Sequence, residues 1–248
     1  MEKFRKMIVI IPMAGESSRF KERGILIPKY MLYAGYHSMF YHSLSSFRDY
    51  FGKCFFVFVC RDVFDTPRFV QGECAKLGIE NYDIKVLNNS TRGQAETVKF
   101  GLTEHYSHLE SELIIFNIDT YRKGLILPTY NDDTIAFFEV FRGAGSNWSF
   151  AEIREPSDII IRTTEKEPIS DLCSTGLYFF KSSSLFLEAY ECYYSKDFSS
   201  EFYVAPLYNS LIKKGTARIL LINSTDVFFY GVPNEYLDFV KWELSEGG

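Results

Sequence analysis

The stretch that decides the fold lies near the start of the chain and reads Ile8-Val9-Ile10-Ile11-Pro12-Met13-Ala14-Gly15-Glu16-Ser17-Ser18-Arg19-Phe20. Its apolar half predicts a buried strand, and the small residues after Pro12 predict a turn where that strand ends. Pro28 and Lys29 follow the turn. Open α/β sheets bind ligands at the carboxyl ends of their strands, where backbone N–H groups attract anions. The stretch therefore predicts an α/β fold with an anion site, and a nucleotide phosphate is the anion we expect.

Apolar runs that are typical of strands alternate with helical patterns along the first part of the chain. The runs that we assign to further strands are 55–60, 84–87, 113–117 and 135–141. The patterns that we assign to helices between them are 39–50, 64–77 and 95–106. This alternation predicts a mixed, mainly parallel α/β sheet that helices flank on both sides.

The later part of the chain has a less regular pattern. Its strand-like runs are 150–154, 159–163, 176–180 and 219–222. Few helical patterns separate them, which predicts a smaller antiparallel extension of the sheet. No repeat or linker interrupts the sequence, so we expect a single domain over residues 1–248.

Composition and charge exclude several classes of protein. A net charge of −5 argues against a general nucleic-acid binder, which would carry a basic face. The apolar run before Pro12 is too short for a signal peptide or a membrane span. Cys54 and Cys60 lie in an apolar run, as is typical of buried thiols in a reducing compartment. We therefore expect a cytoplasmic protein that binds neither nucleic acid nor a membrane.

The first candidate site is the turn after the first strand, with the cations that follow it. The turn residues are Ala14, Gly15, Glu16, Ser17 and Ser18. Small residues let the backbone approach a phosphate closely, and exposed N–H groups there form an anion site. Arg19 can bind phosphate oxygens in a fork, whereas Lys29 acts as a mobile positive charge. An ordinary strand-to-helix turn with two solvated cations explains the same residues equally well when they are taken alone.

The second candidate site is Asp119 in the segment Asn117-Ile118-Asp119-Thr120, which directly follows the strand-like residues 113–116. A carboxylate at the carboxyl end of a strand is well placed to hold Mg²⁺, which bridges phosphates during phosphoryl transfer. An aspartate that ends a strand or caps a turn is the alternative. The position of this residue, rather than its type, favours the metal.

Two further segments carry candidate binding residues. Gly93 lets a ligand approach the backbone closely, and the Gln94 amide suits the edge of a nucleotide base. Thr91 as the cap of the next helix is the alternative there. The pair Glu165-Lys166 can bind sugar hydroxyls and a phosphate, although such a pair is often only a solvated surface pair.

Taken in order, these sites resemble those of the sugar-1-phosphate nucleotidyltransferases, also called nucleoside-diphosphate-sugar pyrophosphorylases. The resemblance covers about residues 7–240 and includes Gly231-Val232-Pro233, which is similar to the family's Gly-Thr-Pro. It is strongest to short members of capsule or lipopolysaccharide biosynthesis. It implies a Rossmann-like, GT-A-like fold and one nucleotidyltransferase domain. The implied reaction joins an NTP and a sugar 1-phosphate to give an NDP-sugar and pyrophosphate.

The resemblance also implies a role for each candidate residue. Arg19 and Lys29 are implied to be catalytic, because they offset charge on the triphosphate. The implied nucleotide-binding residues are Ala14, Gly15, Glu16, Ser17, Ser18, Gly93 and Gln94. The implied sugar-phosphate residues are Glu165, Lys166, Thr175 and Gly176, which lie in segments similar to the family's Glu-Lys pair and sugar-contacting strand. Asp119 is implied to hold the cofactor Mg²⁺.

The chain departs from the family pattern at three positions. Ser17 replaces a glycine of the loop, and Asn117 replaces another residue that is usually glycine. Phe229 stands where the family often has a second metal-binding aspartate, and Asp226 is the nearest carboxylate along the chain. Asp226 is therefore a doubtful second metal ligand.

The sequence leaves other functions open. A GT-A glycosyltransferase would usually show Asp-x-Asp, where this chain has Asn117-Ile118-Asp119. A regulatory homologue that binds nucleotide without catalysis is favoured by the missing second aspartate. The aromatic-rich segment 190–203 is either core or the interface of a homo-oligomer.

Overall fold

The computed structural model describes residues 7–102, 110–195 and 201–246. The strands are β1 (Met7–Pro12), β2 (Tyr33–Ala34), β3 (His37–Ser38), β4 (Cys54–Arg61), β5 (Tyr82–Leu87), β6 (Leu113–Phe116), β7 (Thr120–Arg122), β8 (Thr134–Arg142), β9 (Ser149–Ile153), β10 (Ile160–Glu165), β11 (Leu172–Phe180), β12 (Thr216–Leu221) and β13 (Val227–Phe229). The α-helices are α1 (Ser18–Lys21), α2 (Met39–Ser45), α3 (Thr66–Leu77), α4 (Gln94–Gly101), α6 (Ser183–Tyr194), α7 (Tyr208–Leu211) and α8 (Pro233–Glu246). Short 3₁₀ turns are η1 (Lys29–Met31), η2 (Arg48–Tyr50), η3 (Ala205–Leu207) and η4 (Ser224–Asp226).

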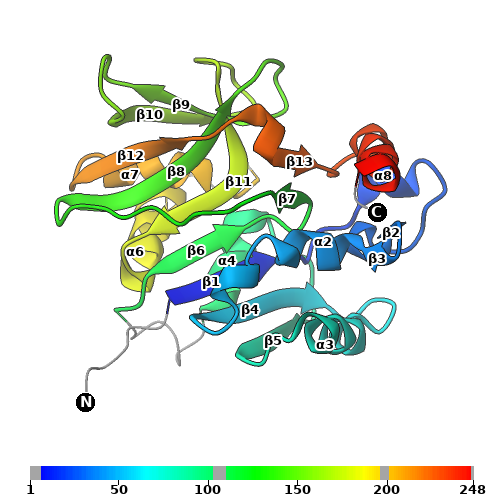
Figure 1. Ribbon diagram of the computed structural model, residues 1–248. Coiled ribbons are helices and arrows are strands. Elements are labelled where there is room, and N and C mark those ends of the chain that lie inside the picture. The colour runs from blue at the N-terminus through cyan, green and yellow to red at the C-terminus, as the bar shows by residue number, and fades with distance from the viewer. Residues whose placement is uncertain (1–6, 103–109, 196–200, 247–248) are drawn as a thin grey trace.

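Strand β1 is at the centre of the parallel half of a nine-stranded sheet (Figure 1). It pairs in parallel with β4 on one side and with β6 on the other, and β4 pairs in parallel with β5. Ile8 is in register with both Phe55 and Leu113. The three central strands therefore end at the same edge of the sheet, and the loops that follow them meet there.

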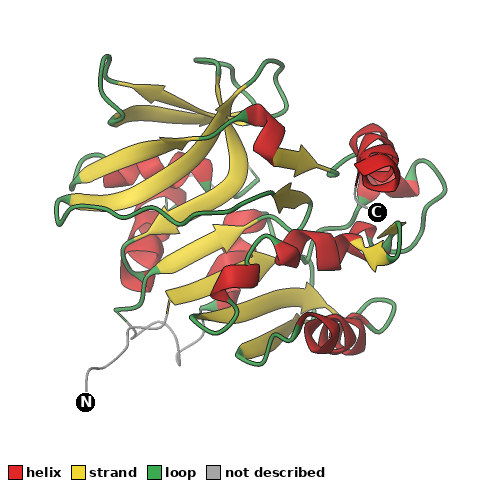
Figure 2. Ribbon diagram, viewed as in Figure 1, coloured by secondary structure: helices red, strands yellow, loops and turns green. Residues whose placement is uncertain are grey.

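Helices cover both faces of this half, as Figure 2 shows. Ile8 and Ile10 point into the core cluster that contains the buried face of α4, whereas Val9 and Ile11 point into the cluster that contains α2 and α3. Burial on both faces explains why β1 is a continuous apolar run rather than an alternating one. Among the described residues, no helix has the length and apolar character needed to cross a membrane.

Strand β11 runs antiparallel and connects the two halves of the sheet. It pairs with β6 and also with β8, and its register with β8 shifts between Ser174 and Tyr178. Gly176 lies in this irregular segment with a φ of +89°, and a Cβ there would lie 2.5 Å from the Asn117 side-chain nitrogen. Only glycine fits this position, because the backbone is left-handed and the space is filled. The irregular segment of β11 therefore lies directly against the end of β6.

The structure confirms the predicted mixed, mainly parallel α/β sheet with helices on both sides and an antiparallel extension. The extension contains β9 and β10, which pair antiparallel. The prediction was wrong for the run 219–222, because β12 pairs in parallel with β8. The physical reason is that β12 pairs with β8, and the long connection from β8 to β12, through β9 to β11, α6 and α7, brings the chain back in the direction of β8. Residues 103–106 of the predicted helix 95–106 lie outside the described residues.

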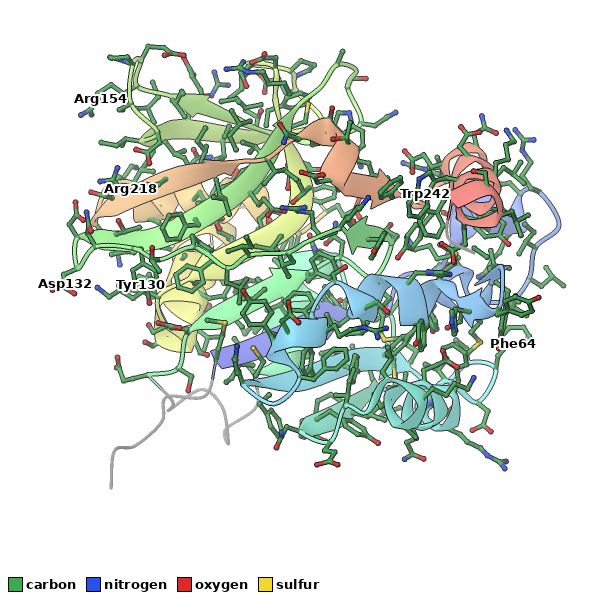
Figure 3. All side chains as sticks on the ribbon, viewed as in Figure 1. Phe64, Tyr130, Asp132, Arg154, Arg218 and Trp242 are labelled. Carbon is green, nitrogen blue, oxygen red and sulfur yellow. The ribbon has the colours of Figure 1, made fainter. Side chains whose placement is uncertain are left out.

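The small sheet of β7 and β13 was not predicted. Each strand has three residues, which is too short for a periodic pattern. Phe229 is in register with Thr120, so the end of β13 lies beside the loop that contains Asp119. Trp242 of α8 lies on the side of that helix that faces this sheet, and its ring centroid is 4.2 Å from that of Phe228 (Figure 3). This packing holds α8 against the small sheet of β7 and β13.

The reactivity of the cysteine thiols tests whether the described core is buried. Cys54 and Cys60 are buried as predicted, and burial raises the pKa of each to about 11. Cys192 is exposed. Because the thiolate is the reactive form, we expect one rapidly reacting thiol in the folded protein at about pH 8. Titration with a thiol reagent measures this number, and Cys192→Ser should remove the rapid phase. More than one rapid equivalent in the wild-type protein would contradict the described burial.

Candidate active site

A cavity of about 730 Å³ lies at the carboxyl edge of the parallel strands. It is lined by the loop after β1, the start of α4, the end of β6, parts of β9 to β11 and the β13–α8 connection. The sequence-predicted residues in this lining are Ala14, Gly15, Glu16, Ser17, Ser18, Arg19, Lys29, Gly93, Gln94, Asp119, Glu165, Lys166, Thr175 and Gly176. The fold therefore brings together segments that are far apart in the sequence.

The loop after β1 is held by a residue that sequence reasoning missed. The Arg61 Nε donates a hydrogen bond of 3.1 Å to the carbonyl oxygen of Ala14. Arg61 is at the end of the neighbouring parallel strand, so its position follows from strand order rather than from sequence spacing. Nothing lies within 4 Å of a Cβ built on Gly15, and Arg19 is exposed in the lining. The loop backbone is fixed while its outer side stays accessible to a ligand.

Ser17 has an unusual backbone conformation in this loop. Its φ is 54° and its ψ is 34°, the left-handed region that favours glycine. The Ser17 Oγ accepts a hydrogen bond of 3.2 Å from the backbone N–H of Lys29. Serine therefore has a strained conformation that favours glycine, and its hydroxyl connects the loop to Lys29.

Lys29 and Asp119 form an ion pair in the cavity, with a hydrogen bond from the Lys29 ammonium to the Asp119 Oδ2. Both side chains are partly exposed, at 22% and 23%. The Asp119 carbonyl accepts a hydrogen bond of 3.0 Å from the Tyr230 N–H, which holds the loop against β13. The pair places one positive and one negative group where a phosphate and a metal ion can each find a partner.

The carboxylate beside Asp119 is Glu235, not Asp226. A Cβ built on Gly231 would lie 2.7 Å from the Asp119 Oδ2 and 3.7 Å from the Glu235 Oε2, so the two carboxylates lie close to the same glycine. Burial, followed by the negative charge of Asp119, raises the pKa of Glu235. The Glu235 Oε2 also accepts a hydrogen bond of 3.2 Å from the Val232 N–H at the start of α8.

The structure does not bring Asp226 to this site, so that expectation needs correction. Asp226 is absent from the cavity lining. Its carbonyl oxygen accepts hydrogen bonds from the Lys123 N–H and the Arg122 Nη1, at 2.9 Å and 3.0 Å. These bonds fix it at the far end of the β7–β13 pair, with Phe229 at the end near Asp119. The antiparallel pairing therefore separates Asp226 from the cavity.

The predicted base-binding segment, Gly93 and Gln94, is also in the lining. The structure gives a different reason for glycine at position 93 than the approach of a ligand. The Gln94 Nε2 donates to the Asn117 Oδ1, so the amide is oriented by the residue that replaces a family glycine. A Cβ on Gly93 would lie 2.5 Å from the carbonyl oxygen of Phe202. Gly93 is thus required by the packing of its own chain, whether or not a ligand approaches it.

The antiparallel half of the cavity contains the Glu165-Lys166 pair. The Ser149 Oγ donates to the Glu165 Oε2, and burial raises the pKa of Glu165. Lys166 has a left-handed φ of 56°, and its N–H donates to the Trp148 carbonyl at 2.9 Å. Backbone strain of this kind often marks functional sites. The Trp148 and Phe229 rings pack with centroids 4.6 Å apart and form an aromatic part of the lining.

Thr175 lines the cavity, but its hydroxyl has a structural partner. The Thr175 Oγ1 donates a hydrogen bond of 2.7 Å to the Glu139 Oε1, and the same oxygen accepts from the Arg122 Nε at 3.1 Å. Glu139 is fully buried in β8. This buried ion pair fixes the irregular segment of β11 from behind, and sequence reasoning missed it because the partners come from separate strands.

Comparisons with known proteins identify the family. A nucleoside-diphosphate-sugar pyrophosphorylase from Vibrio cholerae RC9 is 44% identical in sequence, with a TM-score of 0.87. The alignment covers 94% of this chain and 99% of that one. The chain belongs to the nucleoside-diphosphate-sugar pyrophosphorylase family. No protein-family model and no curated protein matches it.

Two more distant structures share the fold of this pyrophosphorylase-family chain. An inositol-1-phosphate CTP transferase from T. maritima has 12% identity and a TM-score of 0.73, with 98% of each chain covered. A UDP-glucose pyrophosphorylase from Acinetobacter baumanii has 15% identity and a TM-score of 0.72, with 97% of this chain and 94% of that chain covered. The predicted resemblance and the Rossmann-like fold are confirmed.

The conformation of Ser17 in this pyrophosphorylase-family chain gives a stability prediction. Ser17→Ala keeps the left-handed strain and loses the bond from the Lys29 N–H, so it should lower the free energy of unfolding by about 1 kcal/mol. Ser17→Gly loses the same bond but relieves the strain, so it should be more stable than the alanine variant. Urea unfolding measures both values. An alanine variant at least as stable as the glycine variant would contradict this account of the loop.

Proposed function

We propose that this chain transfers a nucleotide from an NTP to a sugar 1-phosphate and releases pyrophosphate. The observation that supports the proposal best is that cations from two separate parts of the fold line one cavity. Arg19 and Lys29 come from the β1 side, and Lys166 comes from the β10–β11 side. Two anionic substrates need such an arrangement, because each brings phosphate charge to the same reacting centre.

In the proposed reaction, an oxygen of the sugar phosphate attacks the α-phosphorus of the NTP in line. The new bond joins that oxygen to the α-phosphorus, the bond from the α-phosphorus to the bridging oxygen breaks, and pyrophosphate leaves with the electron pair. Arg19 and Lys29 offset the charge on the triphosphate and the leaving group. Lys166 holds the acceptor phosphate, and Glu165 accepts hydrogen bonds from sugar hydroxyls. No covalent enzyme intermediate is required.

A divalent metal fits the same site, and we propose Mg²⁺. Asp119 would hold it, with Glu235 as the second carboxylate, because both carboxylates lie close to Gly231 in the cavity lining. Among the described residues, no larger group of His, Cys, Asp or Glu is placed to hold a metal. Mg²⁺ commonly uses one or two carboxylates and completes its shell with water and substrate phosphates. When bound, the ion would neutralise phosphate charge.

Several finer assignments rest on the resemblance. We propose a role in surface polysaccharide biosynthesis and a cytoplasmic location. A homo-oligomer is an alternative to a monomer. The acceptor class is also a proposal, since one structural neighbour is named as an inositol-1-phosphate CTP transferase and another as a UDP-glucose pyrophosphorylase. Family membership favours the nucleotidyltransferase over the GT-A glycosyltransferase. An assay of pyrophosphate release distinguishes the enzyme from a homologue that binds nucleotide without catalysis.

The proposed reaction predicts pyrophosphate release. The protein is incubated with Mg²⁺, each NTP and a panel of sugar 1-phosphates and inositol 1-phosphate, and pyrophosphate is measured. At least one pair should release it stoichiometrically with a nucleotide-linked product. Nucleotide binding by calorimetry without release from any pair would instead favour the non-catalytic homologue.

Arg19 gives a test of the phosphate role. Arg19→Ala should lower kcat by about 100-fold or more, because a positioned cation that offsets transition-state charge is lost. Arg23→Ala is the matched control, since Arg23 lies just beyond α1 and outside the cavity lining. A kcat for Arg19→Ala within twofold of that of the control would refute the assigned role.

The metal assignment predicts which carboxylates matter. Asp119→Asn should weaken Mn²⁺ binding in the presence of nucleotide by about tenfold or more, and Glu235→Gln should weaken it in the same direction. Asp226→Asn should leave it unchanged, because that residue lies outside the cavity lining. Electron paramagnetic resonance of free Mn²⁺ measures binding without turnover. Loss of binding in Asp226→Asn, with Asp119→Asn unaffected, would reverse the assignment.

A further inference from the structure

The ammonium of Lys166 is held by a short segment from elsewhere in the chain. The Lys166 Nζ hydrogen bonds to the Tyr203 hydroxyl and lies 3.7 Å from the Glu201 carboxylate. The Tyr203 hydroxyl donates in turn to the Glu201 Oε2. The ammonium also lies over the Tyr203 ring, 4.7 Å from its centroid. We call residues 201–203 the strap.

Lys166 has open space on two sides, so contacts with the strap are needed to fix the position of its ammonium. Lys166, Tyr203 and Glu201 line the main cavity and also a second cavity of about 410 Å³. Lysine has a flexible four-carbon stem, so backbone position alone does not fix its charge. The Tyr203 hydroxyl and the Glu201 carboxylate are the side-chain partners that define where the ammonium lies.

The strap is joined to the predicted base-binding loop through Phe202. The Phe202 N–H donates to the Arg92 carbonyl at 2.9 Å, and its carbonyl accepts from the Ala95 N–H at 2.8 Å. The Arg92 guanidinium lies over the Phe202 ring, 4.1 Å from its centroid. Gly93 has no room for a Cβ, because the Phe202 backbone fills that space. The backbone of the strap is therefore hydrogen-bonded to residues 92–95 and packed against them.

We propose that Tyr203 is a positioning residue that sets the Lys166 ammonium for the acceptor phosphate, and that Phe202 ties this position to the base-binding loop. The inference rests on the proposed function in assigning the acceptor phosphate to Lys166. A neutral hydroxyl can hold the ammonium without cancelling its charge, so Lys166 keeps its attraction for phosphate. The Glu201 carboxylate is at a longer distance and can be exchanged for the incoming anion.

The test is a double-mutant cycle on the binding of inorganic phosphate, measured by calorimetry. The proteins are the wild type, Tyr203→Phe, Lys166→Met and the double variant. Tyr203→Phe keeps the ring and removes only the hydroxyl, and it should weaken phosphate binding by about tenfold, as expected for a hydrogen bond to a charged group. In the Lys166→Met background the same change should have no effect, because Tyr203 acts through Lys166.

Two outcomes would overturn the proposal. One is equal phosphate binding by the wild type and Tyr203→Phe, and the other is a loss that persists in the Lys166→Met background. Tyr36→Phe is the control for a tyrosine hydroxyl elsewhere, since Tyr36 is 96% exposed. If turnover is found, Tyr203→Phe should raise the KM for the acceptor while leaving the KM for the NTP unchanged. Absence of turnover in the wild type would refute the proposed function, whereas the phosphate cycle would still decide the role of Tyr203.

Discussion

The contact between Gly176 and Asn117 is the constraint on which the rest of the structure depends. At this point β11 passes the end of β6 with no side chain of its own, and the Asn117 amide occupies the space that a Cβ would need. The Asn117 N–H donates to the Gly176 carbonyl at 3.0 Å, which ties the two segments together. Because β11 also pairs with β8, this contact attaches the antiparallel half of the sheet to the parallel half. Residues from the two halves of the sheet therefore line one cavity.

Two lysines of the cavity have carboxylate neighbours within the chain. Lys29 pairs with Asp119, and the Lys166 ammonium lies near Glu201. The Lys29 and Asp119 side chains are only 22% and 23% exposed, so each needs a partner to offset the cost of desolvation. Under the proposed function, phosphates would take the place of these carboxylates as partners of the lysines. Such an exchange would let the same residues be stable without ligand and still bind phosphates.

Glu235, rather than Asp226, is the second carboxylate that we propose for the metal. Phe229 packs against Trp148 and contributes to an aromatic lining, whereas Glu235 brings a carboxylate to Asp119 from the first turn of α8. Sequence distance made Asp226 the natural substitute. The antiparallel register of β13 with β7 places it at the opposite end of that pair.

Much of the fold could be predicted because buried strands leave a clear apolar pattern. The apolar runs at β1, β4 and β6 predicted both the sheet and the edge at which the site lies. The loops that follow these strands could therefore be predicted to line the cavity. The strands β7 and β13 were too short to carry a pattern, so the position of Glu235 was not predictable. Arg61 and Glu139 act across strands that are distant in sequence, and no local signal points to such partners.

The central claim is that the two halves of one cavity bind two different phosphates. Its most direct test is a crystal structure with Mg²⁺ and the NTP that binds most tightly by calorimetry. The account predicts the triphosphate over the loop 14–19, the base beside Gln94, and the surroundings of Lys166 free for an acceptor. A nucleotide with its base against Trp148 and Glu165, and with the β1 loop unused, would contradict it.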